Sequence, residues 1–198
     1  MSLHDIMTKN TFYCLEDTVA IVKGRISTST SIRLKGWLKS IRQTQQFGTL
    51  LIDSKGGIAD TDLLVEIFKT PLHVHVLDNA QSWAMCMALC ASHLTCNPKA
   101  VFMNHASQWD MLKSSEEVAE DQHLIDSHNY KVASMLSSTL PAGSVRNEIA
   151  ESLSNEADTY FAVDWLWENA IIDHIAPVDL SNLDDQKMAK VLEEMYNE

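Results

Sequence analysis

A serine marks an abrupt change of character in the stretch DNAQSWAMC, residues 78–86. The segment before it, LHVHVLD at 72–78, is β-branched and alternating, which predicts a strand. The segment 82–94 is strongly apolar and predicts a buried core helix. Ser82 at this junction is either a helix cap or an exposed nucleophile beside the positive end of a helix. Taken alone, this stretch favours the cap.

Two further segments carry residue types that a nucleophilic serine needs. DSKGG at 53–57 follows a buried apolar run, and a glycine there lets a backbone N–H approach a carbonyl closely. The N–H groups of Gly57 and Trp83 would together form an oxyanion hole. His105 ends the strand-like run KAVFMNH, where parallel sheets tend to place their sites. A glycine pair most often makes only a turn, and a single histidine is most often structural, so neither segment decides the question alone.

The remaining pattern predicts an α/β fold with mainly parallel strand pairing, because strand-like and helix-like segments alternate. Residues 1–17 look loosely structured, and a long helix is predicted over 114–138. The predicted strands are 17–24, 49–54, 72–78, 99–105 and a last one in IDHIAPV, and the other predicted helices are 32–46, 61–69, 82–94, the segment SVRNEIAESLSNEAD and 161–173.

Over residues 17–178, the chain resembles the proteolytic subunit of the Clp protease. The resemblance lies in LLIDSKGG, DNAQSWAMCMALCASH, VFMNHAS and EADTYFAVDWLWENAIID, in that order. It implies a crotonase-like ββα-superhelix core with a protruding handle helix. A single domain, 1–198, is then expected to comprise an N-terminal arm (1–16), the handle helix (114–138) and a C-terminal helical extension (181–198), where an apolar stripe has helical spacing.

By this resemblance, Ser82 is the nucleophile, His105 the general base and Asp158 the acid that orients the histidine, while Gly57 and Trp83 supply the oxyanion donors. It implies a self-compartmentalising serine endopeptidase that cleaves unfolded proteins or short peptides without a cofactor. The implied partners are copies of the chain in heptameric rings, stacked as a tetradecamer through the handle helix, and an ATP-dependent unfoldase.

The chain departs from the family pattern at several places that bear on function. Asp78 replaces a glycine and adds a carboxylate near the site, which is expected to repel acidic peptides. Lys55 stands where the family has proline in the glycine turn, which loosens the backbone or adds a positive charge beside the site. HASQWDMLKSS, residues 105–115, lacks the glycine-rich segment that binds substrate by strand addition. Two alternatives therefore stay open: a catalytically silent ring subunit with an assembly or regulatory role, and a crotonase-type enzyme acting on thioesters.

Composition narrows the partners of the chain. Its 198 residues carry a formal net charge of −12, which argues against nucleic acid and against an anionic membrane surface. No apolar run is long enough to span a bilayer, and the N-terminal residues show no secretory signal, which predicts a cytoplasmic location.

Two groups of residues have spacings that metal ligands use. Cys86, Cys90 and His93 have helical spacing, and His73 and His75 share one face of a predicted strand. Both groups lack further ligands at suitable spacing. We therefore expect packed or solvated side chains and no metal.

Overall fold

The structure, a computed structural model, describes residues 12–106, 115–155 and 157–178, which form a mixed α/β fold around an eight-stranded sheet. The sheet order is β1-β2-β3-β4-β5-β8, with β6 and β7 on a branch from β4. Pairing is parallel except between β1 and β2 and between β6 and β7, which confirms the predicted α/β class with mainly parallel strands. The strands are β1 (Phe12–Cys14), β2 (Val19–Lys23), β3 (Gly48–Ser54), β4 (Leu72–Gln81), β5 (His93–Cys96), β6 (Val101–Asn104), β7 (Thr159–Phe161) and β8 (His174–Ile175).

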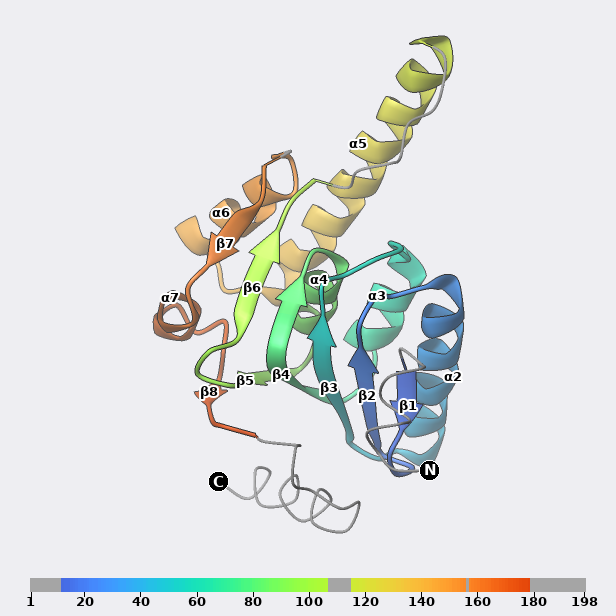
Figure 1. Ribbon diagram of the computed structural model, residues 1–198, viewed down its shortest axis with the longest axis vertical. Coiled ribbons are helices and arrows are strands. Elements are labelled where there is room, and N and C mark those ends of the chain that lie inside the picture. The colour runs from blue at the N-terminus through green and yellow to red at the C-terminus, as the bar shows by residue number, and fades with distance from the viewer. Residues whose placement is uncertain (1–11, 107–114, 156, 179–198) are drawn as a thin grey trace.

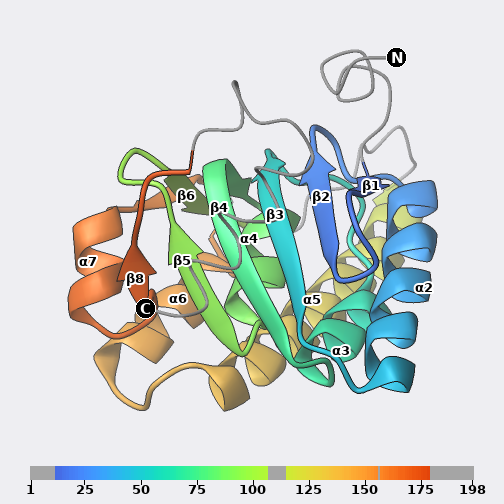
Figure 2. The ribbon, with the colours of Figure 1, turned by 90° about the horizontal axis from the view of Figure 1, so that it is seen from below.

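The sheet divides at β4, the longest strand (Figure 2). The first half of β4 pairs with β5, from His73 to Val76, and its last residues, Asn79 to Gln81, pair with β6. The parallel strands β2, β3, β4 and β6 therefore end at the same edge. Segments that follow these four strands meet at that edge, where α/β sheets place their ligands.

The first two described helices begin where a side chain accepts a hydrogen bond from one of their first N–H groups. Ser27 and Thr30 form a reciprocal capping box, so the first helix begins at Thr28, four residues before the predicted start. Asp60 accepts a hydrogen bond from the N–H of Leu63 and caps the second described helix, which begins at Thr61. The described helices are α2 (Thr28–Thr44), α3 (Thr61–Phe68), α4 (Trp83–Leu89), α5 (Ser115–Thr139), α6 (Ser144–Ser152) and α7 (Val163–Glu168).

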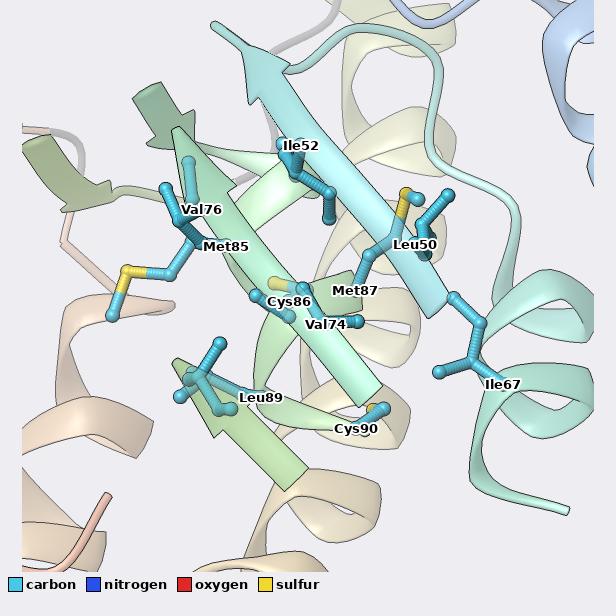
Figure 3. Packing of buried hydrophobic residues seen from close by; sticks show 14 of the residues in the cluster. Leu50, Ile52, Ile67, Val74, Val76, Met85, Cys86, Met87, Leu89 and Cys90 are labelled. Carbon is cyan, nitrogen blue, oxygen red and sulfur yellow. The ribbon is translucent and has the colours of Figure 1, made fainter. Parts of the chain in front are cut away.

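Helix α4, which follows Ser82, is the centre of the core, and all seven of its residues are buried. Figure 3 shows its methionine and cysteine side chains packed against Leu50 and Ile52 of β3 and Val74 of β4. Burial of each large apolar side chain contributes about 1.5–3 kcal/mol. The start of α4, and with it Ser82, is therefore held firmly against the sheet.

Tertiary pairing overrides three of the predicted segments. The predicted helix 82–94 ends at Leu89, and its last residues enter β5, because the N–H of Ser92 donates to the carbonyl of Leu72 and β5 pairs with β4. The predicted helix 161–173 is shortened to α7 at both ends. Phe161 pairs with β6 as part of β7, and beyond Glu168 the chain turns at Ala170, with φ 55°, so that the N–H of Asp173 donates to the carbonyl of Leu94. Part of the loosely structured N-terminal segment forms β1.

The cause at β1 is Phe12, which is buried with its ring centroid 6.5 Å from that of Trp37. Residues 1–11 of the predicted arm and the predicted C-terminal extension, 181–198, lie outside the described residues.

Helix α5 spans Ser115–Thr139, close to the predicted 114–138. Figure 1 shows its first turns projecting beyond the sheet, while Val132 and Leu136 near its other end are buried in the core. Within the described ranges, no helix combines the length and the apolar character needed to cross a membrane.

The face of β4 opposite α4 carries a hydrogen-bonded pair of buried histidines. Asn97 donates through Nδ2 to the carbonyl of Val178, so its Oδ1 is an acceptor and Nε2 of His75 donates to it at 3.0 Å. Nδ1 of His75 then accepts from the hydroxyl of Thr95 at 2.8 Å. That hydroxyl in turn accepts from Nε2 of His73 at 2.7 Å. With both imidazoles neutral, every hydrogen bond of this chain has one donor and one acceptor.

These histidines predict a loss of stability in mild acid. Burial lowers the pKa of His73 and of His75 to about 4, from about 6.5 in the unfolded chain. Between pH 6.5 and 4 the unfolded state therefore binds more protons than the folded state. The free energy of unfolding is highest above pH 6.5 and decreases as the pH falls through this range. We expect each histidine to lower the free energy of unfolding by about 2 kcal/mol between pH 7 and pH 5, measured by urea denaturation.

The exposed His174 supplies the control, because His174→Gln should leave this pH dependence unchanged. An NMR titration in which the His75 imidazole protonates near pH 6.5 would contradict the prediction.

Candidate active site

Ser82 links β4 to α4 in a strained backbone conformation, with φ 53° and ψ −126°. L-residues rarely occupy this region, and such residues cluster at functional sites. The Ser82 side chain makes no capping hydrogen bond to α4, so the structure excludes the cap interpretation. Its N–H donates to the carbonyl of Met103 at 2.7 Å, and its carbonyl accepts from the N–H of Met85 at 3.0 Å. These bonds fix the turn from both sides and leave the hydroxyl for another partner.

That partner is His105, which follows directly after β6. Oγ of Ser82 lies 2.8 Å from Nε2 of His105, a normal hydrogen-bond distance. The N–H of His105 donates to Oδ1 of the buried Asn104, which helps to place the ring. With Nε2 unprotonated, His105 is placed to remove the hydroxyl proton, as activation of a serine nucleophile requires.

Asp158 lies on the other side of the imidazole, because Thr159 of β7 is paired with Asn104 of β6. Oδ1 of Asp158 is 4.0 Å from Nδ1 of His105, beyond hydrogen-bond distance, and the Asp158 side chain is 50% exposed. Nδ1 is buried and has no hydrogen-bond partner in the part of the chain that the structure describes. The third predicted residue therefore faces the correct nitrogen without reaching it.

The two glycines of the turn after β3 pack against Ser82. At Gly56, φ is +89°, and a Cβ there would lie 2.7 Å from Cβ of Ser82 and 3.1 Å from N of Trp83. The N–H of Gly56 donates to Oγ of Ser54, whereas the N–H of Gly57 has no acceptor among the described residues. The N–H of Trp83, in the first turn of α4, likewise has no acceptor among the described residues. Gly57 and Trp83 thus retain the two amides that an oxyanion hole needs.

The segment after β2 holds this glycine turn in place. The N–H of Ile26 donates to the carbonyl of Gly56, and the carbonyl of Ile26 accepts from the N–H of Ile58, both at 2.9 Å. Oγ of Ser54 also donates to the carbonyl of Gly24 at 2.5 Å. A Cβ on Gly57 would lie 2.1 Å from the carbonyl oxygen of Ile26, so only glycine fits this position.

A cleft of about 1030 Å³ contains four of the five predicted site residues. Asp158 is not among its lining residues. The lining also includes residues that the sequence analysis did not single out for the site, and most of them come from the ends of β2, β3 and β4. These are Lys23, Gly24, Arg25, Asp53, Ile58, Ala59, Asn79 and His128.

Most of these residues lie at or shortly after the end of a predicted strand, and that position was the available signal. His128 comes from α5, and nothing in its sequence context indicated it. Its ring lies over the Trp83 indole, with centroids 5.5 Å apart. Burial, with a smaller contribution from Lys131, lowers the pKa of His128.

The two metal-ligand spacings in the sequence do not become ligand clusters. Cys86 and Cys90 are buried in the core, where burial raises the pKa of Cys90 to about 12 and that of Cys86 as well, so both remain thiols. His93 lies in β5 and not in the predicted helix, and its Nδ1 is 3.8 Å from Oδ2 of Asp173 at the surface. The nitrogens of His75 are bonded to Thr95 and Asn97, as described above.

Comparison of the sequence with protein-family models gives no match, and comparison with curated proteins gives no match. The geometry of the site therefore carries the functional argument. A hydroxyl bonded to an imidazole, beside two available amides, is an arrangement suited to attack on a carbonyl carbon.

Replacement of Gly56 tests how closely the turn controls Ser82. Gly56→Ala places a Cβ within 2.7 Å of the Ser82 side chain, and alanine is itself strained at the positive φ of position 56. The Ser82 hydroxyl should therefore be displaced. We expect labelling of Ser82 by a fluorophosphonate to slow by about 100-fold, the effect of a displacement of about 1 Å in a reacting group.

Gly36→Ala in α2 is the matched control, because nothing lies within 4 Å of a Cβ there. This variant should label at the wild-type rate and gain about 0.5–1 kcal/mol of stability. Equal labelling rates of the Gly56→Ala and wild-type proteins would show that the turn does not position the serine.

Proposed function

We propose that the chain is a subunit of a serine endopeptidase of the Clp type. The observation that carries this proposal is the 2.8 Å hydrogen bond between Oγ of Ser82 and Nε2 of His105 at a strained serine. The available amides of Gly57 and Trp83 beside that serine support the same conclusion. Acyl transfer needs these parts together, whereas a structural serine needs none of them.

The proposed reaction proceeds through an acyl-enzyme. His105 accepts the Ser82 proton at Nε2 while Oγ attacks the carbonyl carbon of a peptide bond. The N–H groups of Gly57 and Trp83 donate to the resulting oxyanion. His105 then transfers the proton to the leaving amine, and water, activated by the same imidazole, releases the second product. Asp158 is a positioning residue that holds Nδ1 of His105 when the gap between them closes.

The finer fold and assembly also belong to this proposal. Division of the sheet at β4 and the projecting helix α5 fit a crotonase-like core with a handle helix (Figure 1). By the same resemblance, the chains assemble in heptameric rings that stack as a tetradecamer, act in the cytoplasm and receive unfolded proteins from an ATP-dependent unfoldase. The 1030 Å³ cleft is large enough for several residues of an extended peptide.

Removal of the nucleophile gives the direct test. Ser82→Ala should lower kcat for a fluorogenic peptide by several orders of magnitude, because the covalent step is lost. The variant should keep its molar mass in light scattering, since Ser82 contacts its own chain. Peptide cleavage that persists in Ser82→Ala would show that the nucleophile lies elsewhere.

A catalytically silent subunit is the second candidate, and the 4.0 Å gap between Asp158 and His105 favours it. An imidazole whose Nδ1 lacks a partner has neither its tautomer nor its orientation fixed. In this state Ser82 and His105 form a dyad without the acid. Contacts in an assembly that bring Asp158 to Nδ1 would complete the triad.

Asp158→Asn distinguishes an active enzyme from a silent subunit. In an active peptidase whose gap closes, the change should lower kcat by up to about 10⁴-fold through loss of histidine orientation, with little change in KM. Asp164→Asn, which replaces another acidic residue near the start of α7, should have no comparable effect. A wild-type protein that neither cleaves peptides nor reacts with a fluorophosphonate would favour the silent subunit.

A further inference from the structure

The cleft has the opposite charge to the chain as a whole. The chain carries a net charge of −12, yet the cleft is lined by three cations and one carboxylate: Lys23, Arg25, Lys55 and Asp53. The carboxylate of Asp53 already has partners. Its Oδ2 is 3.7 Å from Nζ of Lys23, which balances its charge, and its Oδ1 accepts a hydrogen bond from the Asn79 amide at 2.9 Å. Arg25 and Lys55 have no ion pair with any described residue.

Backbone pairing places these two unpaired cations beside the oxyanion glycines. Arg25 lies between Gly24, which bonds to the last two residues of β3, and Ile26, which bonds to Gly56. Lys55 lies between these two points of attachment. Ile26 is fully buried, and neighbouring side chains in an extended segment point in opposite directions, so the Arg25 side chain points away from the core. Arg25 and Lys55 are both exposed and both line the cleft.

We propose that the cleft selects peptides with acidic side chains close to the scissile bond, and that Arg25 and Lys55 determine this specificity. The proposal rests on the peptidase function. A carboxylate in the cleft would meet two cations without disrupting an existing ion pair. A substrate lysine in the same position would face like charges, and repulsion of wrong partners is where charges contribute most to specificity.

Among the described residues, no carboxylate other than Asp53 lines the cleft. Asp158 lies on the opposite side of the His105 ring from Ser82, and Asp78, though exposed, is not among the cleft-lining residues. Asp60, which follows the lining residues Ile58 and Ala59, is paired with Lys35 at 2.9 Å. Among the described residues, the cations of the cleft therefore set the sign of the interaction with a bound peptide.

Peptide binding to the full-length Ser82→Ala protein tests the proposal without turnover. Three peptides share one apolar scaffold and an uncharged fluorophore, and they carry two Glu, two Gln or two Lys residues. In fluorescence anisotropy at 50 mM NaCl, the Glu peptide should bind about 10-fold more tightly than the Gln peptide, and the Lys peptide most weakly. At 500 mM NaCl the preference should fall to about 2-fold.

Substitution of the two cations assigns the effect to the cleft. Arg25→Gln combined with Lys55→Gln, in the Ser82→Ala background, should reduce the preference for Glu over Gln to less than about 2-fold at 50 mM NaCl. Lys99→Gln, a change of an exposed lysine outside the cleft, should leave the preference intact. Equal binding of the Glu and Gln peptides, or a preference that survives the double substitution, would overturn the proposal.

Fluorophosphonate labelling of the wild-type protein separates this proposal from the peptidase function. Labelled Ser82 without a preference for acidic peptides would leave the peptidase and refute the specificity. A preference for acidic peptides without labelling would refute the peptidase and leave an acidic-peptide binding site. For an active enzyme, kcat/KM for the three peptides should follow the order of their affinities.

Discussion

The backbone strain at Ser82 is the constraint on which the site depends. A non-glycine residue in this region costs about 1–3 kcal/mol, so the surrounding structure must supply more than that. Helix α4 does so, because burial of Trp83, Met85, Met87 and Leu89 contributes about 1.5–3 kcal/mol for each side chain. The hydroxyl is thereby directed away from the helix it would otherwise cap and toward His105.

Division of the sheet at β4 brings the partners of Ser82 to one place. Because β6 pairs only with the end of β4, His105 emerges beside Ser82, although 23 positions separate them. Antiparallel β7 then sets Asp158 next to His105 through the pairing of Thr159 with Asn104. A slip of one residue in that register would turn the side chains of β7 to the opposite face and remove Asp158 from the site.

Hydrophobic periodicity predicted most of the fold, and it failed where pairing with distant strands competed with it. The apolar run 82–94 has no local signal for a helix end, yet β5 forms because Ser92 and the residues after it bond to β4. Among the site residues, Ser82, His105 and the glycine pair stood out because each follows a predicted strand. Asp158 required the family resemblance, and His128 was missed because it reaches the cleft from a helix distant in sequence.

The sequence by itself determined the α/β class, the mainly parallel pairing and the residue types at the ends of the strands, since these follow from local periodicity and turn chemistry. It also carried the positive charges of Arg25 and Lys55. Only the tertiary structure decided that the Ser82 side chain does not cap α4 and that Asp158 stands 4.0 Å from His105. It also decided that Arg25 and Lys55, beside the glycine turn, have no ion pair with a described residue. Such distances arise from pairing between segments far apart in the chain, and local patterns contain no information about that register.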